Sequence, residues 1–89
     1  MAKKKEEPII TQTEILAIAG RSIQEEIIDK RRETNELAER LKEVGKQKDA
    51  DYLRDATERQ LTYHMERLKA IETMYEIQTG TALGLMDEL

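Results

Sequence analysis

Two long stretches of this 89-residue chain carry helix-compatible patterns of nearly equal length, and a short polar joint connects them. The stretches cover residues 11–44 and 49–78, and the joint covers residues 45–48. Helices of matched length with a short connection fold back on each other as antiparallel neighbours. The sequence therefore predicts an all-α antiparallel two-helix hairpin, with long helices at about 12–44 and about 50–79.

The composition favours long, solvent-exposed helices over a compact mixed fold. Hydrophobic residues and charged residues each make up 38% of the chain, which has only four Gly and one Pro. Phe and Trp are absent and Tyr occurs three times, so strand-forming aromatic residues are scarce. We expect a core built from layers of Ile, Leu, Met and Ala between the helices.

The first helix has a clear start signal. Thr11 and Glu14 fit a capping box, in which each side chain bonds the backbone N–H of the other residue. Ile10 precedes this cap and Ile15 lies at the fourth helical position, which is the spacing of a hydrophobic staple. The sequence therefore predicts that the helix begins directly after Thr11.

The remaining helix ends are predicted from glycine and aspartate. Gly45 and Gly80 suit the left-handed conformation that ends a helix. Asp49 and Asp51 are both acceptable N-caps for the second helix. We divide the chain into a disordered N-terminal tail at 1–10, a helical hairpin at 11–80, and a short apolar C-terminal tail or short helix at 81–89.

A two-helix hairpin buries little apolar surface by itself. The simplest remedy is a two-fold homodimer, in which two hairpins form a four-helix bundle with coiled-coil-like packing. A third element formed by the C-terminal tail would add to this core without replacing a partner chain. The sequence thus predicts self-association.

A polar layer is expected halfway along the hairpin. If the turn centres near residue 47, Leu37 faces Thr57, and four polar seam residues meet: Lys30, Thr34, Gln60 and His64. Such a layer fixes register and partner choice in helical bundles. It is alternatively a small-molecule or anion site with Lys30 and His64 as its chemical groups. No acid lies three or four residues from His64, so the Glu-x-x-His pattern of bundle metal sites is missing and we predict no metal.

Apolar residues concentrate at the open end of the hairpin, away from the turn. We expect this end to be covered by the C-terminal tail or by a second copy, with docking of a separate protein as the alternative. The predicted apolar end and interface comprise Ile15, Leu16, Ile18, Ile23, Ile27, Leu68, Ile71 and Tyr75.

Charge and cysteine content exclude several classes of function. The net charge is −4, and acids and bases are interleaved, so no clustered basic face predicts nucleic-acid binding. Without Cys there is no disulfide framework or thiolate metal site. No apolar run approaches the ~20 residues that span a bilayer. We expect a cytoplasmic protein with no cofactor and no membrane partner.

One group of basic residues resembles the ligands of the small all-helical chorismate mutases. The spacing of Arg31, Lys42 and Arg54, with Asp55 after the last Arg, is similar to their run of dicarboxylate ligands. The similarity covers about 25 residues. It departs from the family at the start, because Arg21 is too close to Arg31 to serve as the early arginine. The resemblance implies an isomerase that binds a dicarboxylate through Arg and Lys.

The sequence contains no nucleophile constellation, phosphate loop or dinucleotide fingerprint. Our expectation is therefore a small non-enzymatic helical interaction or accessory module that acts through self-association and partner binding. The chorismate-mutase-like enzyme is the alternative.

Overall fold

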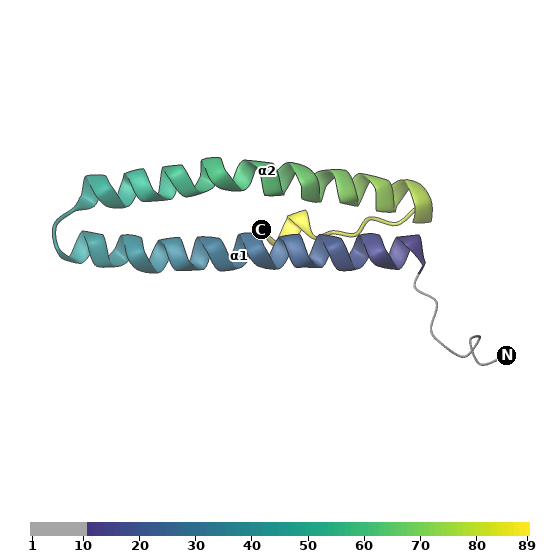
Figure 1. The fold of residues 1–89 in the computed structure, drawn as a ribbon, viewed down its shortest axis with the longest axis horizontal. Coiled ribbons are helices and arrows are strands. Elements are labelled where there is room, and N and C mark those ends of the chain that lie inside the picture. Colours follow the sequence, from purple (N-terminus) through teal and green to yellow (C-terminus); the bar gives the residue numbers. More distant parts are fainter. Residues whose placement is uncertain (1–10) are drawn as a thin grey trace, which may run out of the picture.

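The computed structural model describes residues 11–89 and confirms an all-helical hairpin (Figure 1). Helix α1 covers Gln12–Glu43, helix α2 covers Gln47–Thr79, and a short 3-10 turn, η2, covers Met86–Glu88. The two long helices lie antiparallel, and the C-terminal segment returns along them (Figure 1). The predicted disordered tail at 1–10 and the Ile10 half of the predicted staple lie outside the described residues.

The predicted capping box at the start of α1 is confirmed. The backbone N–H of Glu14 donates to Thr11 Oγ1 at 3.2 Å, and the backbone N–H of Thr11 donates to Glu14 Oε1 at 3.0 Å. The bond from the Thr11 backbone lowers the pKa of Glu14 below its ordinary value. Two N–H groups that the helix leaves unpaired are thus satisfied locally, which fixes where α1 begins.

The turn between the helices is tighter than predicted. Gly45 adopts the left-handed conformation with φ 79°, and its N–H donates to Lys42 O at 3.0 Å. The N–H of Lys46 donates to Leu41 O at 2.8 Å, which completes a Schellman motif. Because this motif reverses the chain at once, α2 begins at Gln47. The prediction of Asp49 or Asp51 as the N-cap was wrong: the cap is Lys46, without a side-chain cap bond.

The earlier start of α2 shifts the pairing of the helices by about one turn. Thr57 hydrogen-bonds Thr34, with 2.9 Å between the two hydroxyl oxygens, and both residues are buried. The predicted pairing of Leu37 with Thr57 was therefore wrong. Leu37 instead lies at the edge of the helix pair, where 46% of it is exposed.

The interface between the helices buries both small and large side chains. Ala38 near the end of α1 and Ala50 near the start of α2 are fully buried, and Ile27 and Leu68 are the largest fully buried side chains. The nearby Leu37 is 46% exposed, so near the turn the buried positions of the helix interface are held by alanine. The buried residues of α1 are Ala17, Gly20, Ile23, Gln24, Ile27, Thr34 and Ala38, and those of α2 are Ala50, Thr57, Leu61 and Leu68.

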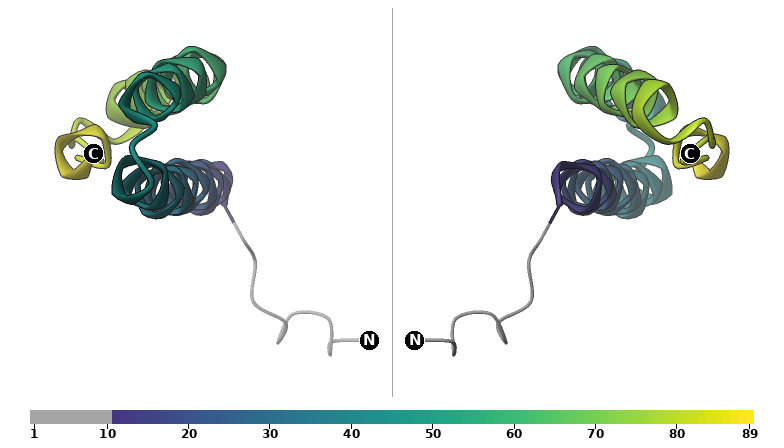
Figure 2. Two further views of the ribbon diagram at one scale, coloured as in Figure 1. Left: turned by 90° about the vertical axis from the view of Figure 1, so that its left-hand side faces the viewer. Right: turned by 90° about the vertical axis from the view of Figure 1, so that its right-hand side faces the viewer.

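The C-terminal tail forms the third layer of the core. Helix α2 ends at Thr79, and Gly80 is, as predicted, the left-handed residue that stops it. The chain then runs back on one side of the helix pair, and the end-on views of Figure 2 show η2 to that side of both α1 and α2. Leu85 is buried and packs with Ile27 and Leu68. A Cβ at Gly20 would lie 2.9 Å from Leu85 Cδ1, so this glycine makes room for the tail.

Candidate functional site

Polar contacts fasten the tail to both helices. Gln24 of α1 is buried, and its Nε2 donates to Leu85 O at 3.0 Å and to Glu88 Oε1 at 3.1 Å. From α2, Glu72 Oε2 accepts the N–H of Met86 at 2.9 Å. The carbonyl of Leu85 and the N–H of Met86, which belong to no long helix, thereby each have a hydrogen-bond partner. The tail is thus held in a defined position by apolar packing and by side-chain hydrogen bonds.

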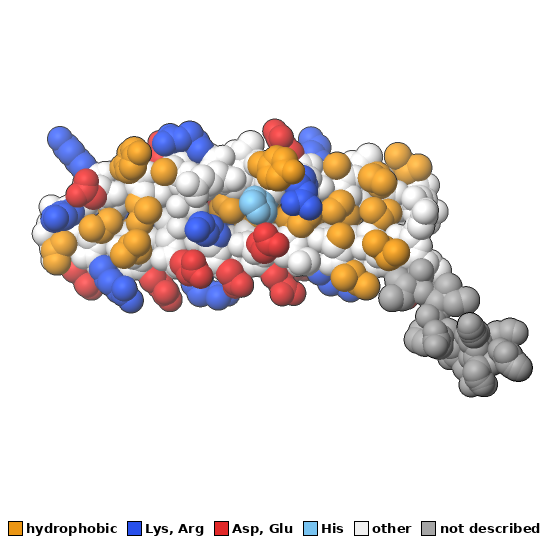
Figure 3. Space-filling model, viewed as in Figure 1, with side chains coloured by type: hydrophobic (Ala, Val, Ile, Leu, Met, Phe, Trp, Pro, Cys, Tyr) orange, Lys and Arg blue, Asp and Glu red, His pale blue; other side chains and the backbone are white. Residues whose placement is uncertain are grey.

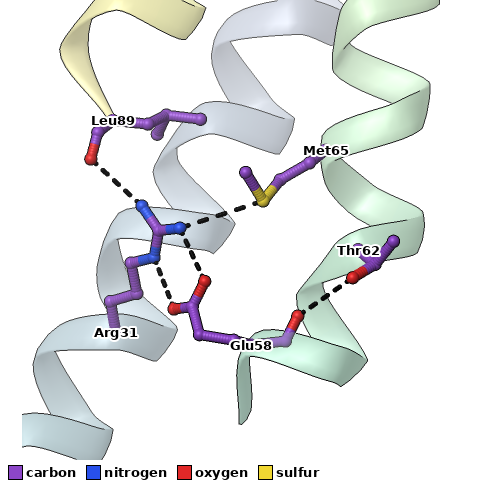
Figure 4. A network of polar contacts seen from close by, with 5 residues as sticks. All are labelled: Arg31, Glu58, Thr62, Met65 and Leu89. Atoms are coloured by element: carbon purple, nitrogen blue, oxygen red, sulfur yellow. Dashed lines mark hydrogen bonds and ion pairs between the residues drawn. The ribbon is translucent and has the colours of Figure 1, made fainter. Parts of the chain in front are cut away.

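Arg31 joins α1, α2 and the end of the tail (Figure 4). Its Nε and Nη2 donate to the two carboxylate oxygens of Glu58, both at 2.8 Å. Its Nη1 donates to the backbone oxygen of Leu89 at 3.0 Å, and its Nη2 lies 3.8 Å from Met65 Sδ. Such a two-pronged bond suits the planar guanidinium fork. The guanidinium therefore couples the position of the tail to the register of the helices.

This pairing changes the acid–base behaviour of both groups. The hydrogen bonds from Arg31 hold the pKa of Glu58 below the ordinary glutamate value. The same bonds raise the pKa of Arg31, which is charged at any ordinary pH. Because the folded-state pKa of Glu58 is lowered, the pair stabilises the fold fully above the ordinary glutamate pKa. That contribution disappears as pH falls through the lowered pKa.

We expect the stability gap between the wild type and Glu58→Gln to close on acidification. Above about pH 5 the wild type should be more stable by less than about 1 kcal/mol, since Glu58 is half exposed and water screens the pair. Below about pH 4.3 the gap should shrink as Glu58 takes up a proton. Urea unfolding at pH 6 and pH 3 measures both values. Glu66→Gln, on an exposed residue of α2, is the control, and an unchanged gap at pH 3 would contradict the prediction.

The groove between the helices has a second side, which we call the open face, opposite the tail (Figure 3). At its middle lies a hollow of about 450 Å³, lined by Glu26, Asp29, Lys30, Glu33, Gln60, Leu61 and His64. Three residues of the predicted polar layer, Lys30, Gln60 and His64, therefore meet here. Thr34 is buried in the seam beside them, and it shares a neighbouring hollow with Lys30 and Gln60.

His64 is the most enclosed polar group of this hollow. Its Nε2 lies 3.3 Å from Glu26 Oε2, so the acid partner that the sequence of α2 lacks comes from α1. Its Nδ1 is buried and has no hydrogen-bond partner within residues 11–89. The ring also meets Tyr63 edge to face, with the centroids 6.0 Å apart. The contact with Glu26 joins two helices, so it could not be predicted from the spacing of residues along α2.

Apolar side chains flank the polar middle of the open face at both ends. In Figure 3 the His64 ring lies near mid-length, and hydrophobic side chains gather toward the turn and toward the open end. Near the turn, Leu37 and Leu53 line one hollow. Near the open end, Ile15, Leu16 and Met74 line another. Exposure reaches 46% for Leu37, 48% for Met74 and 53% for Ile15.

The predicted apolar end divides into core and surface. Ile23, Ile27 and Leu68 are buried in the core, and Ile71 packs against that core. Leu16 and Tyr75 are half-buried, whereas Ile15 and Ile18 are exposed. The tail thus covers the inner part of this set, and the outer part stays accessible.

The basic residues of the chorismate-mutase resemblance are paired with acids of the same chain. Arg31 forms its ion pair with Glu58. Arg54 Nη2 lies 3.1 Å from Glu39 Oε2, and Lys42 Nζ lies 3.6 Å from that same oxygen. The hydrogen bond from Arg54, with the charge of Lys42, lowers the pKa of Glu39. A dicarboxylate ligand would have to compete with these carboxylates.

The hydrogen bonds of Gln24 and Glu72 to the tail were not predicted from the sequence. Gln24 and Glu72 lack a distinctive motif, and their roles depend on where the returning tail lies. The one indication in the sequence is the apolar character of residues 83–89, because apolar side chains of this kind are normally buried against another part of the protein.

Comparison of the chain with protein-family models, with curated proteins and with solved structures gives no match. Neither of the long helices in residues 11–89 has an apolar stretch long enough to cross a membrane. Within the same residues, no group of three or more His, Asp or Glu side chains is placed to hold a metal ion.

Proposed function

We propose that this chain is a non-enzymatic self-association module whose open face docks on a second copy. The observation that supports the proposal is that the tail covers only one of the two sides of the helix pair. The tail buries one side, whereas the other presents partly exposed Leu37, Met74 and Ile15. Two copies joined through their open faces would form a homodimeric four-helix bundle.

The size of the open face supports a second copy as its occupant. A helix of 32 residues is ~48 Å long, and two adjacent helices are ~20 Å wide. The face therefore offers ~1,000 Å², compared with about 800 Å² per partner in a standard stable interface. A second hairpin matches this face along its full length.

The pattern on the face also supports self-association. Its apolar ends lie at either side of a polar middle, so two copies can bury apolar patches against each other while the polar groups meet at the centre. A polar layer of this kind specifies register and partner in helical bundles at some cost in stability. In the dimer, Lys30, Gln60 and His64 would serve that role.

We expect the double variant Leu37→Glu, Met74→Glu to raise the dissociation constant of the dimer by at least about 100-fold. Each carboxylate would be placed against apolar surface, and each substitution occurs twice in a two-fold dimer. Sedimentation equilibrium from nanomolar to high micromolar concentration measures the dissociation constant, and circular dichroism checks helicity.

Ile18→Glu is the matched control for this experiment. Ile18 is exposed to a similar extent, at 55%, but it borders a hollow with Thr13, Arg21 and Tyr75 that lies away from the Ile15 patch. The control should dimerise as the wild type does. A wild-type chain that sediments as a folded monomer at high micromolar concentration would overturn the proposal.

A further inference from the structure

The two edges of the open face carry different charges at mid-length. The α1 edge has three carboxylates, of Glu26, Asp29 and Glu33, against the single ammonium of Lys30. In Figure 3 acidic side chains gather below the His64 ring, on the α1 side. The polar middle is therefore acidic along α1.

The α2 edge carries no carboxylate at this level. It presents Gln60 and His64 to the central hollow, with Arg67 one turn further along the same face of the helix. The Arg67 guanidinium lies over the Tyr63 ring, 5.5 Å from its centroid. Glu66 is the one acid in residues 60–67, and at two positions from His64 it projects from a different side of the helix. The α2 edge is therefore neutral to basic.

Two-fold symmetry allows two ways of stacking these faces with the helices aligned. If the axis runs along the hairpin, α1 of each copy packs on α2 of the other, and both turns lie at the same end. If the axis runs across the hairpin, α1 packs on α1 and α2 on α2, and the turns lie at opposite ends. Neighbouring helices are antiparallel in both, so helix direction does not choose between them.

We infer that the two copies dock with their turns at the same end. This inference rests on the proposed function. The charges at the middle of the open face favour this arrangement over the other. With the turns together, the acidic α1 edge of each copy meets the α2 edge that carries Arg67. With the turns apart, two acidic α1 edges meet at the centre, where like charges repel. The apolar ends pair in both arrangements, for example Leu37 with Leu53 when the turns are together.

Distances between spin labels distinguish the two arrangements. The chain has no cysteine, so Lys46→Cys places a single nitroxide at the turn and Glu76→Cys places one near the open end. With the turns together, each variant should give an intermolecular distance of ~20 Å, about two interaxial spacings. With the turns apart, each should give ~50 Å, close to the length of the helices.

A mixture of the two labelled chains is the internal control. In a mixed dimer, the distance runs from the label at the turn of one copy to the label near the open end of the other. It should be ~50 Å with the turns together and ~20 Å with the turns apart. Long distances within each variant, in a sample that sediments as a dimer, would overturn the inferred arrangement and leave the proposed function standing. A monomer without any intermolecular distance would overturn both.

A charge reversal gives a second, independent test. Arg67→Glu should raise the dissociation constant about tenfold if the turns are together, because the new carboxylate faces the acidic α1 edge of the other copy. If the turns are apart, residue 67 faces α2 of the other copy and the constant should change little, which would contradict the inference. Arg59→Glu alters the net charge equally, at an exposed residue paired with Asp55, and should leave the constant unchanged.

Discussion

Replacing Leu68 by alanine is expected to lower the free energy of unfolding by about 2–5 kcal/mol. Leu68 is fully buried, and it packs with Ile27 and Leu61 from the two helices and with Leu85 from the tail. The truncation removes apolar surface and leaves a cavity at the point where all three layers meet. Because small domains are stable by only about 5–15 kcal/mol, this one change should remove a large share of the total.

Urea unfolding followed by far-UV circular dichroism measures the loss. The variants are compared at one protein concentration, since self-association would add to the apparent stability. Ile77→Ala is the matched control: Ile77 is 79% exposed on the same helix, and its truncation should change the stability by less than about 0.5 kcal/mol. Equal effects of the two substitutions would show that Leu68 is not in the core.

Replacing Leu85 by alanine is expected to detach the tail before it unfolds the hairpin. Leu85 is 7% exposed and fills the space above Gly20, so its truncation should weaken tail docking by at least about 2 kcal/mol. The helices keep their own backbone hydrogen bonds when the tail leaves. The loss of global stability is therefore limited to what the docked tail contributes.

Hydrogen exchange at the Met86 amide reports tail detachment directly. This amide donates to Glu72, so its protection depends on the docked tail. We expect protection to fall by at least about 30-fold in Leu85→Ala, the equivalent of ~2 kcal/mol. Asp87→Ala, at an exposed residue of the same tail, should leave it unchanged. Unaltered protection in Leu85→Ala would mean that the tail is held by its polar contacts alone.

Local signals in the sequence were enough for the helices and most of their ends. The capping box at Thr11 and the stops at Gly45 and Gly80 are set by residues within one turn of each boundary. The start of α2 was misplaced because Lys46 is not a preferred cap, and the Schellman motif at Gly45 outweighed the aspartates further on. That error of a few residues produced the wrong pairing of Leu37.

The sequence predicted only some of the polar contacts at the middle of the hairpin. The helical period of the sequence placed Lys30, Gln60 and His64 near one another, and they share one hollow in the structure. The contact of Glu26 with His64, by contrast, joins two helices, and the bidentate pair of Arg31 with Glu58 depends on the true register. Neither follows from spacing within a single helix.

The sequence by itself determined two helices of matched length and a hairpin, because caps, stops and apolar periodicity act over short distances along the chain. The tertiary structure alone decided the register, the burial of small residues such as Ala38 and Ala50, and the side of the helix pair that the tail covers. These depend on how side-chain volumes fit together across elements far apart in sequence. Gly20 illustrates the difference, because the need for a residue without a side chain at this position arises only when Leu85 packs against it.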